Sequence, residues 1–157
     1  MKPVILPCVL LASACATKPV MPILYEAATQ QRVSKLDFAT TEARFRAAVD
    51  APGGPEILAV IDHGANAAEA GLELSPSKLF LIGNPEAGTP LMQAEPLMGM
   101  ELPLHFLIFE AEGEVKVAYP LMQAIGRDYS VIEQDARLQA MEEAVDAILT
   151  QATGSRG

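Results

Sequence analysis

Asp62 and His63 could perform acid–base chemistry, because they are adjacent at the end of an apolar run. Imidazole is the side chain that titrates near neutral pH without perturbation, and a carboxylate beside it can orient it. In an enzyme, His63 would be the general base, Asp62 would orient it, and Asn84 and Gln93 would position the substrate. Alternatively, His63 donates a hydrogen bond to a backbone carbonyl and has no part in catalysis. The pattern favours a protein that is not an enzyme.

Polar residues follow two apolar runs, 56–62 and 78–83, which are expected to be strands. In open α/β sheets, ligands bind at the carboxyl ends of strands. If these strands are neighbours, their following residues converge on one pocket for a small ligand or a partner protein. The residues expected there are His63, Asn66, Asn84, Thr89 and Gln93. In the alternative, the Asn and Thr side chains only cap helices.

A copper site is a further alternative, because methionine and histidine are ligands of the type that copper accepts. The candidates are Met92, Met98, Met100 and His105. Methionine also fills hydrophobic cores, and this chain has only 5% aromatic residues and no tryptophan. We therefore favour a packing role for the methionines, and we expect no metal and no cofactor.

The charge distribution argues against nucleic acid as a partner. The chain has 11 basic and 20 acidic residues, for a net charge of −9. Binding to nucleic acid requires clustered Lys and Arg that replace counterions, and no such cluster is present.

The first residues are typical of a secretory signal peptide, with one lysine, an apolar stretch and then small residues. The apolar stretch, Val4 to Leu11, is too short to cross a bilayer as a helix. The segment LLASAC resembles a bacterial lipoprotein signal that would be cleaved after residue 14 and lipidated at Cys15. Residues 15–29 would then tether the domain to a membrane, and the resemblance favours the periplasmic side of the outer membrane. Cleavage without lipidation of Cys15 is the alternative.

Residues 30–152 are expected to form one α/β domain, and 153–157 a short tail. The predicted strands are 31–38, 56–62, 78–83 and a hairpin over 103–119, and the predicted helices are 40–50, 66–71, short turns over 84–96, and 131–151. This order, βαβαβ(α)ββα, favours a single-domain sandwich with a mixed sheet. An exposed edge of that sheet could support a homodimer.

Capping residues predict where three short helical segments begin. Asn66 with Glu69 three positions later matches a capping box. Asn84 precedes Pro85, which suits the first position of a helix, and Thr89 precedes Pro90 in the same way. We therefore expect two short helical turns, each with its own cap.

Residues 60–104 carry a resemblance to a known family. The motifs are Ile61-Asp62-His63, Ala70 to Leu72, Gly83-Asn84-Pro85, Gly88 to Gln93, and Leu102-Pro103-Leu104. In these motifs and their spacing, the chain resembles domain-of-unknown-function family 302, which comprises small bacterial and archaeal α/β domains. The resemblance implies an α/β fold over the domain and no particular reaction.

Overall fold

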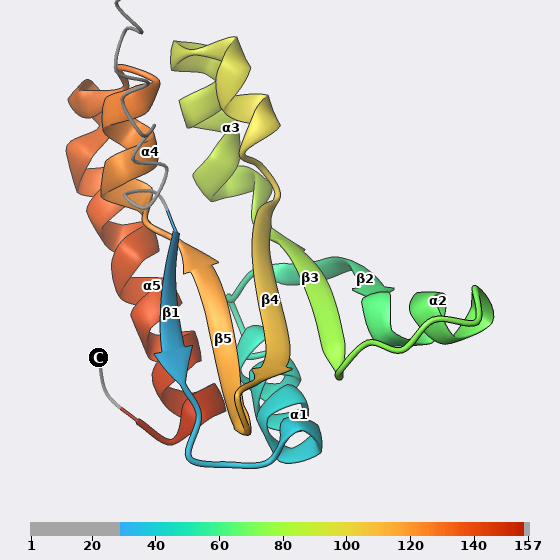
Figure 1. The fold of residues 1–157 in the computed structure, drawn as a ribbon. Coiled ribbons are helices and arrows are strands. Elements are labelled where there is room, and N and C mark those ends of the chain that lie inside the picture. The colour runs from blue at the N-terminus through green and yellow to red at the C-terminus, as the bar shows by residue number, and fades with distance from the viewer. Residues whose placement is uncertain (1–28, 156–157) are drawn as a thin grey trace, which may run out of the picture.

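The computed structural model describes residues 29–155, which form one α/β domain, as predicted (Figure 1). The strands are β1 (Thr29–Val33), β2 (Glu56–Asp62), β3 (Ser77–Gly83), β4 (Leu104–Ala111) and β5 (Glu114–Pro120). The helices are α1 (Phe38–Val49), α2 (His63–Glu69), α3 (Pro85–Ala94), α4 (Met122–Asp128) and α5 (Asp135–Thr153), with short 3₁₀ turns η2 (Pro96–Met100) and η3 (Ile132–Gln134).

The sheet has five strands in the order β1-β5-β4-β3-β2, and every neighbouring pair is antiparallel. The predicted mixed sheet is therefore wrong. A parallel pair arises when a crossover helix returns the chain beside the strand it left. Here α1 connects β1 at one edge to β2 at the opposite edge, so the two strands joined by this crossover never pair.

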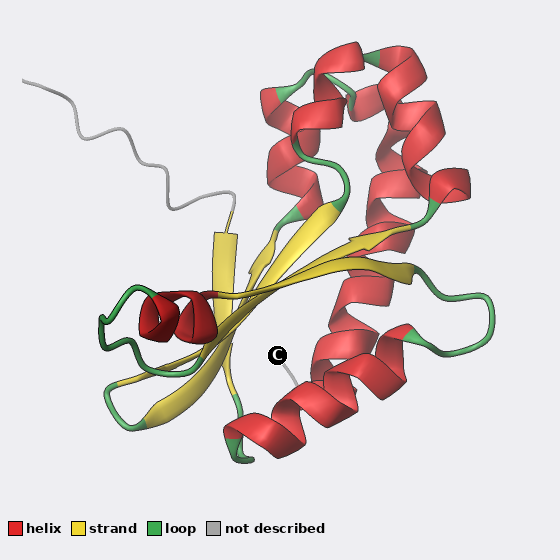
Figure 2. Ribbon diagram, turned by 90° about the vertical axis from the view of Figure 1, so that its right-hand side faces the viewer, coloured by secondary structure: helices red, strands yellow, loops and turns green. Residues whose placement is uncertain are grey.

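The hydrophobic core lies between the sheet and the helices α1 and α5, which lie on the same face of it (Figure 2). The Phe45 ring on α1 lies 5.0 Å from that of Phe80 and 5.4 Å from that of Phe106, centroid to centroid. The predicted apolar stripe on the last helix is confirmed, because Leu138, Val145, Ile148 and Leu149 are buried and Met141 is partly buried.

The strand β2 is at an edge of the sheet and has no buried residue, although its apolar run predicts a buried strand. The exposed fractions are 58% for Leu58, 38% for Val60 and 37% for Ile61. A continuous apolar run usually indicates that both faces are covered. In this fold, β3 covers one edge of β2 and α1 contacts it only lightly.

Two of the three predicted helix caps, Asn66 and Thr89, differ from the structure. Helix α2 begins at His63, and its cap is Asp62, whose carboxylate accepts a hydrogen bond from the Ala65 N–H at 2.9 Å. The predicted capping box at Asn66 is therefore wrong. Asp62 is also a favourable capping residue, and it caps the helix four residues before Asn66.

Helix α3 begins as predicted, with Asn84 as its cap and Pro85 in its first turn. The Asn84 side chain accepts from the Glu86 N–H at 3.0 Å. However, α3 is one helix through to Ala94, with Pro90 inside it. Thr89 is consequently an interior residue of α3, and the predicted second cap is wrong.

The predicted hairpin is confirmed by the pairing of β4 with β5. Glu112 and Gly113 connect the two strands with φ angles of 57° and 78°. Two consecutive positive φ values are the geometry of a type I′ turn, whose twist matches that of the paired strands.

Candidate functional site

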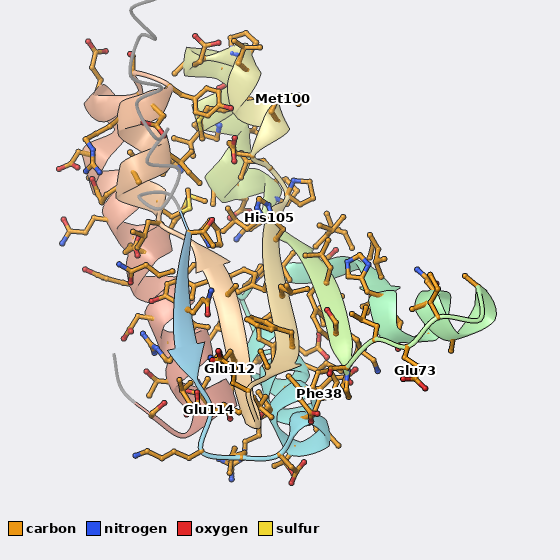
Figure 3. The ribbon with its side chains drawn as sticks, in the orientation of Figure 1. Phe38, Glu73, Met100, His105, Glu112 and Glu114 are labelled. Atoms are coloured by element: carbon orange, nitrogen blue, oxygen red, sulfur yellow. The ribbon has the colours of Figure 1, made fainter. Side chains whose placement is uncertain are left out.

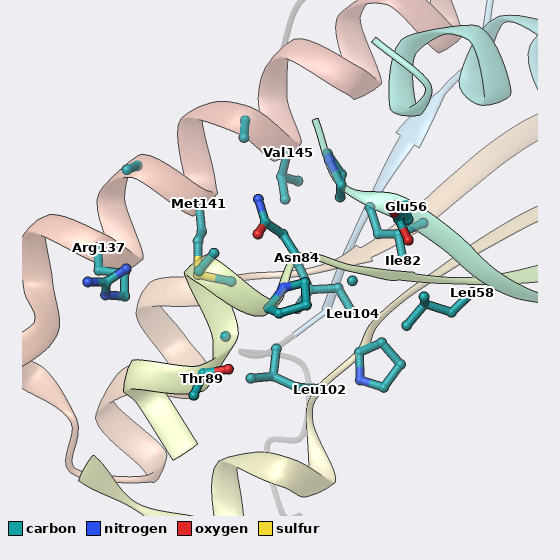
Figure 4. Close-up of a pocket in the computed structure, with 18 of the residues that line it drawn as sticks. Glu56, Leu58, Ile82, Asn84, Thr89, Leu102, Leu104, Arg137, Met141 and Val145 are labelled. Carbon is teal, nitrogen blue, oxygen red and sulfur yellow. The ribbon is translucent and has the colours of Figure 1, made fainter. Parts of the chain in front are cut away.

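A cleft of about 720 Å³ opens between α3 and α5, beyond the ends of β3 and β4 (Figure 4). Its lining is mostly apolar. The residues that face it from the sheet include Leu58, Ile82 and Leu104, those from the helices include Met92, Met141, Val145 and Ile148, and Leu102 faces it from the loop before β4. This volume lies within the range of about 300–1,000 Å³ that is typical of sites for small molecules.

The cleft exists because small residues line the two helices that flank it. On α5, Ala136, Ala140 and Ala144 are spaced four residues apart, which places them on one side of the helix. On α3, Ala87 and Gly88 face the same space. A Cβ at Gly88 would lie 3.2 Å from Cδ1 of Leu102, so this wall is already closely packed around a glycine.

Arg137 on α5 is a charged residue in the cleft lining, and it connects α5 to α3. Its Nη1 donates a hydrogen bond to the Glu86 carbonyl at 3.2 Å. In an uninterrupted helix, that carbonyl would accept from the N–H of the residue four positions later. That residue is Pro90, which has no N–H. The proline therefore leaves an acceptor available, and Arg137 uses it.

Other polar residues in the lining are Asn84, Thr89 and Glu56. The side-chain oxygen of Asn84 caps the start of α3, and Thr89 is exposed. Glu56, at the start of β2, is exposed and lies at the other end of the cleft from Arg137 (Figure 4). The two charged side chains thus mark opposite ends of an apolar space.

The structure divides the five residues that were expected to share a pocket. In the antiparallel pair, Asp62 lies opposite Lys78, and Glu56 lies opposite Gly83. The residues that follow β2 and β3 are therefore at opposite ends of the sheet, and the expected convergence is wrong. Asn84 and Thr89 line the cleft, while Gln93 is exposed outside its lining. His63 and Asn66 lie far from it on α2.

Asp62 does not orient His63 in the way that a general base would require. Its carboxylate accepts from Ala65 N–H and lies 3.4 Å from Nζ of Lys78. The Ala65 N–H is the main cause of a lowered pKa for Asp62, and Lys78 adds to it. Within residues 29–155, no hydrogen bond joins Asp62 to His63. The catalytic hypothesis thus lacks its expected geometry.

The four candidate copper ligands have dissimilar surroundings. Met98 is completely buried in the core, whereas Met100 is 78% exposed. His105 is exposed at the start of β4, and Met100 lies on the neighbouring turn η2 (Figure 3). In the described part of the chain, no group of three or more His, Cys, Asp or Glu residues could hold a metal ion.

Sequence reasoning missed Arg137 and the alanines of α5. A signal for them is present in the sequence, since Pro90 inside a helix releases the carbonyl of Glu86. The partner of that carbonyl is 51 residues away in the chain, so only the packing of α5 beside α3 identifies it. Cys15, the signal peptide and almost all of the tether lie outside the described residues.

The antiparallel sheet with helices over one face, and a cleft at one end, defines a small α/β domain. A family model described as "Domain of unknown function DUF302" matches residues 30–152, so the chain belongs to this family. A crystal structure of the uncharacterized conserved protein DUF302 from Bacillus stearothermophilus has the same fold, with a TM-score of 0.71. It is 16% identical, and the match covers 80% of this chain and 98% of that one.

Curated relatives share part of the sequence. The protein named "Fluoride-specific ion channel FluC 1" from Brucella suis biovar 1 (strain 1330) is 33% identical over 103 residues, which are 64% of this chain and 41% of that protein. The protein of the same name from Brucella abortus biovar 1 (strain 9-941) is 33% identical over 64% of this chain and 38% of its own length. The match thus spans about two-fifths of these relatives. Among residues 29–155, no helix is both long and apolar enough to cross a membrane.

Proposed function

We propose that this domain binds an elongated, mostly apolar small molecule in the cleft between α3 and α5, without catalysing a reaction on it. The observation that carries the proposal is the cleft itself, an apolar space of about 720 Å³ with a few polar groups at its rim. Binding sites for small molecules commonly have this combination.

The hydrophobic effect would supply most of the affinity. Each methylene group that leaves water contributes about 0.8 kcal/mol. An alkyl chain could contact Met141 and Val145 on α5 and Leu102 on the opposite side. No nucleophile or acid–base pair lies among these contacts, which is why binding is proposed and catalysis is not.

The test is to fill the cleft. Ala140→Leu and Ala144→Leu add bulk on the cleft side of α5, where both alanines are exposed and a larger side chain is compatible with the helix. Ala43→Leu, on the exposed side of α1, is the matched control. Isothermal titration with n-octanol should show binding to the wild type and to the control, weakened about tenfold or more in the cleft variants, which is about 1.4 kcal/mol. Equal binding by all four proteins would place the ligand elsewhere.

A second candidate function is association with a second copy of the chain along β2. This strand is an open edge of the sheet, and Leu58 to Ile61 form an exposed run without charge. In a chain with a net charge of −9, two copies can approach closely where charge is absent. An open, apolar edge strand is a template for pairing with another strand.

Ala59→Lys would place a charge in the middle of this edge. Sedimentation equilibrium should show a dimer for the wild type, a monomer for this variant, and a dimer for Ala43→Lys on α1. A wild-type protein that remains monomeric at high concentration would contradict the proposal.

We further propose that the domain acts in the cell envelope, anchored by lipid on Cys15. The support is the sequence pattern that precedes and includes this cysteine. More than one acyl chain gives stable membrane attachment, whereas a single chain is marginal. Labelling of the full chain with a radioactive fatty acid in a bacterial host should be lost in Cys15→Ser, and the variant should leave the membrane fraction. Unchanged labelling would refute the assignment.

A further inference from the structure

We infer that the ligand of the α3–α5 cleft is an amphiphile with a single anionic head group, which Arg137 recognises. This inference rests on the proposed binding function and adds the chemical class of the ligand. It is based on the burial and the unfilled hydrogen bonding of the Arg137 side chain, which is half-buried at one end of a mostly apolar space (Figure 4).

No described carboxylate forms an ion pair with Arg137, and its hydrogen-bond acceptor is the uncharged Glu86 carbonyl. Two other arginines differ in this respect. Arg32 pairs with Asp146 at 2.6 Å, and Arg46 pairs with Glu42 at 2.7 Å. A guanidinium that is partly removed from water without an anion is a favourable place for an anionic group to bind.

The hydrogen bonding of Arg137 is also incomplete. Its Nε is the one buried side-chain nitrogen or oxygen in residues 29–155 that has no hydrogen-bond partner. Buried donors are normally paired, so an orphaned one calls for an explanation. With Nη1 on Glu86, the remaining edge of the guanidinium consists of Nε and Nη2. Two parallel N–H groups of this kind match the oxygens of a carboxylate or a phosphate.

The surroundings set the orientation of the ligand. The apolar tail would extend from Arg137 past Met141 and Val145 towards Leu58. Glu56 at the far end would repel a second anionic group, which favours a ligand with one charged end. Nε is covered in this structure, so we expect the guanidinium to turn when the head group binds.

The experiment compares four octyl ligands by isothermal titration: octanoate, octyl phosphate, n-octanol and octyltrimethylammonium. The wild type should bind the two anions about tenfold or more tightly than the alcohol, and the cation most weakly. Arg137→Gln should remove this preference while retaining the affinity for n-octanol. Arg137→Lys, which keeps the charge but lacks the paired N–H groups, should retain only part of it. The relative affinities of octanoate and octyl phosphate identify the head group.

Arg127→Gln is the matched control, because it removes the same charge from an exposed position on α4. An equal loss of the anion preference in this control would show a general charge effect and would overturn the inference. Binding of all four ligands with one affinity would also overturn it, while leaving the proposed function intact. If no ligand binds the wild type, the proposed function itself fails.

Discussion

At the scale of single residues, Pro90 and Arg137 show how a helix defect becomes a contact between helices. The proline removes the donor that the Glu86 carbonyl would use within α3, and Arg137 supplies one from α5. The cost of an interior proline is thereby partly offset by a tertiary hydrogen bond. The same bond holds the guanidinium at the rim of the cleft, where it can meet a ligand.

Asn84 and Thr89 test the placement of the α3 cap. Asn84→Ala removes the side chain that accepts from the Glu86 N–H, so the free energy of unfolding should fall by about 1 kcal/mol. Thr89→Ala should change it by less than about 0.5 kcal/mol, because Thr89 is an exposed interior position of the helix. Urea unfolding followed by circular dichroism measures both. A larger loss in Thr89→Ala would restore the idea of two separately capped turns.

At the scale of elements, the sequence predicts what depends on local pattern. The strand before Asn84, the Glu112-Gly113 hairpin and the apolar stripe on α5 all follow from spacing over a few residues. Contacts between residues that are distant in the chain cannot be predicted from this local spacing. The run at 56–62 is as apolar as a buried strand, and only the sheet order shows that it lies at an edge. For the same reason, the antiparallel pairing of β2 with β3 separates His63 from Asn84.

Three elements are joined by charge around Lys78. Its Nζ donates to Glu42 of α1 at 2.9 Å and lies 3.4 Å from Asp62, the cap of α2. Burial by itself would raise the pKa of Glu42, but hydrogen bonds and charge from Lys78 and Arg46 outweigh it and lower the pKa overall. The same contacts raise the pKa of Lys78, with the bond to Glu42 as the largest cause.

This network predicts a specific pH dependence. Because the folded pKa of Glu42 is lowered, its contribution to stability is present above the ordinary value of about 4.3 and is lost as pH falls through the folded pKa. Glu42→Gln should therefore be less stable at pH 7 and lose less stability on acidification than the wild type. Urea unfolding at several pH values measures this slope. Glu69→Gln, an exposed change on α2, is the control, and an equal effect there would exclude a special role for Glu42.

At the scale of the whole molecule, the helices cover one face of the sheet and leave the cleft at the end where α3 and α5 approach each other. The α/β class and the family could be predicted from the sequence. The cleft could not be predicted from the sequence. Alanines and a glycine form part of its walls, and whether such small residues leave a space depends on what packs opposite them. The sequence directed attention to Asn84 and Thr89, which do line it, and also to His63, which does not.

The most direct test of the central claim uses methionine as a reporter, because Met92 and Met141 line the cleft while Met98 and Met122 are buried in the core. Methyl resonances of ¹³C-labelled methionines would be followed while n-octanol is titrated into the protein. Binding in the cleft predicts saturable shifts of Met92 and Met141, with much smaller shifts of Met98, Met122 and the exposed Met100. Shifts confined to Met100, or no saturable shift at Met92 and Met141, would contradict the assignment of the cleft as the binding site.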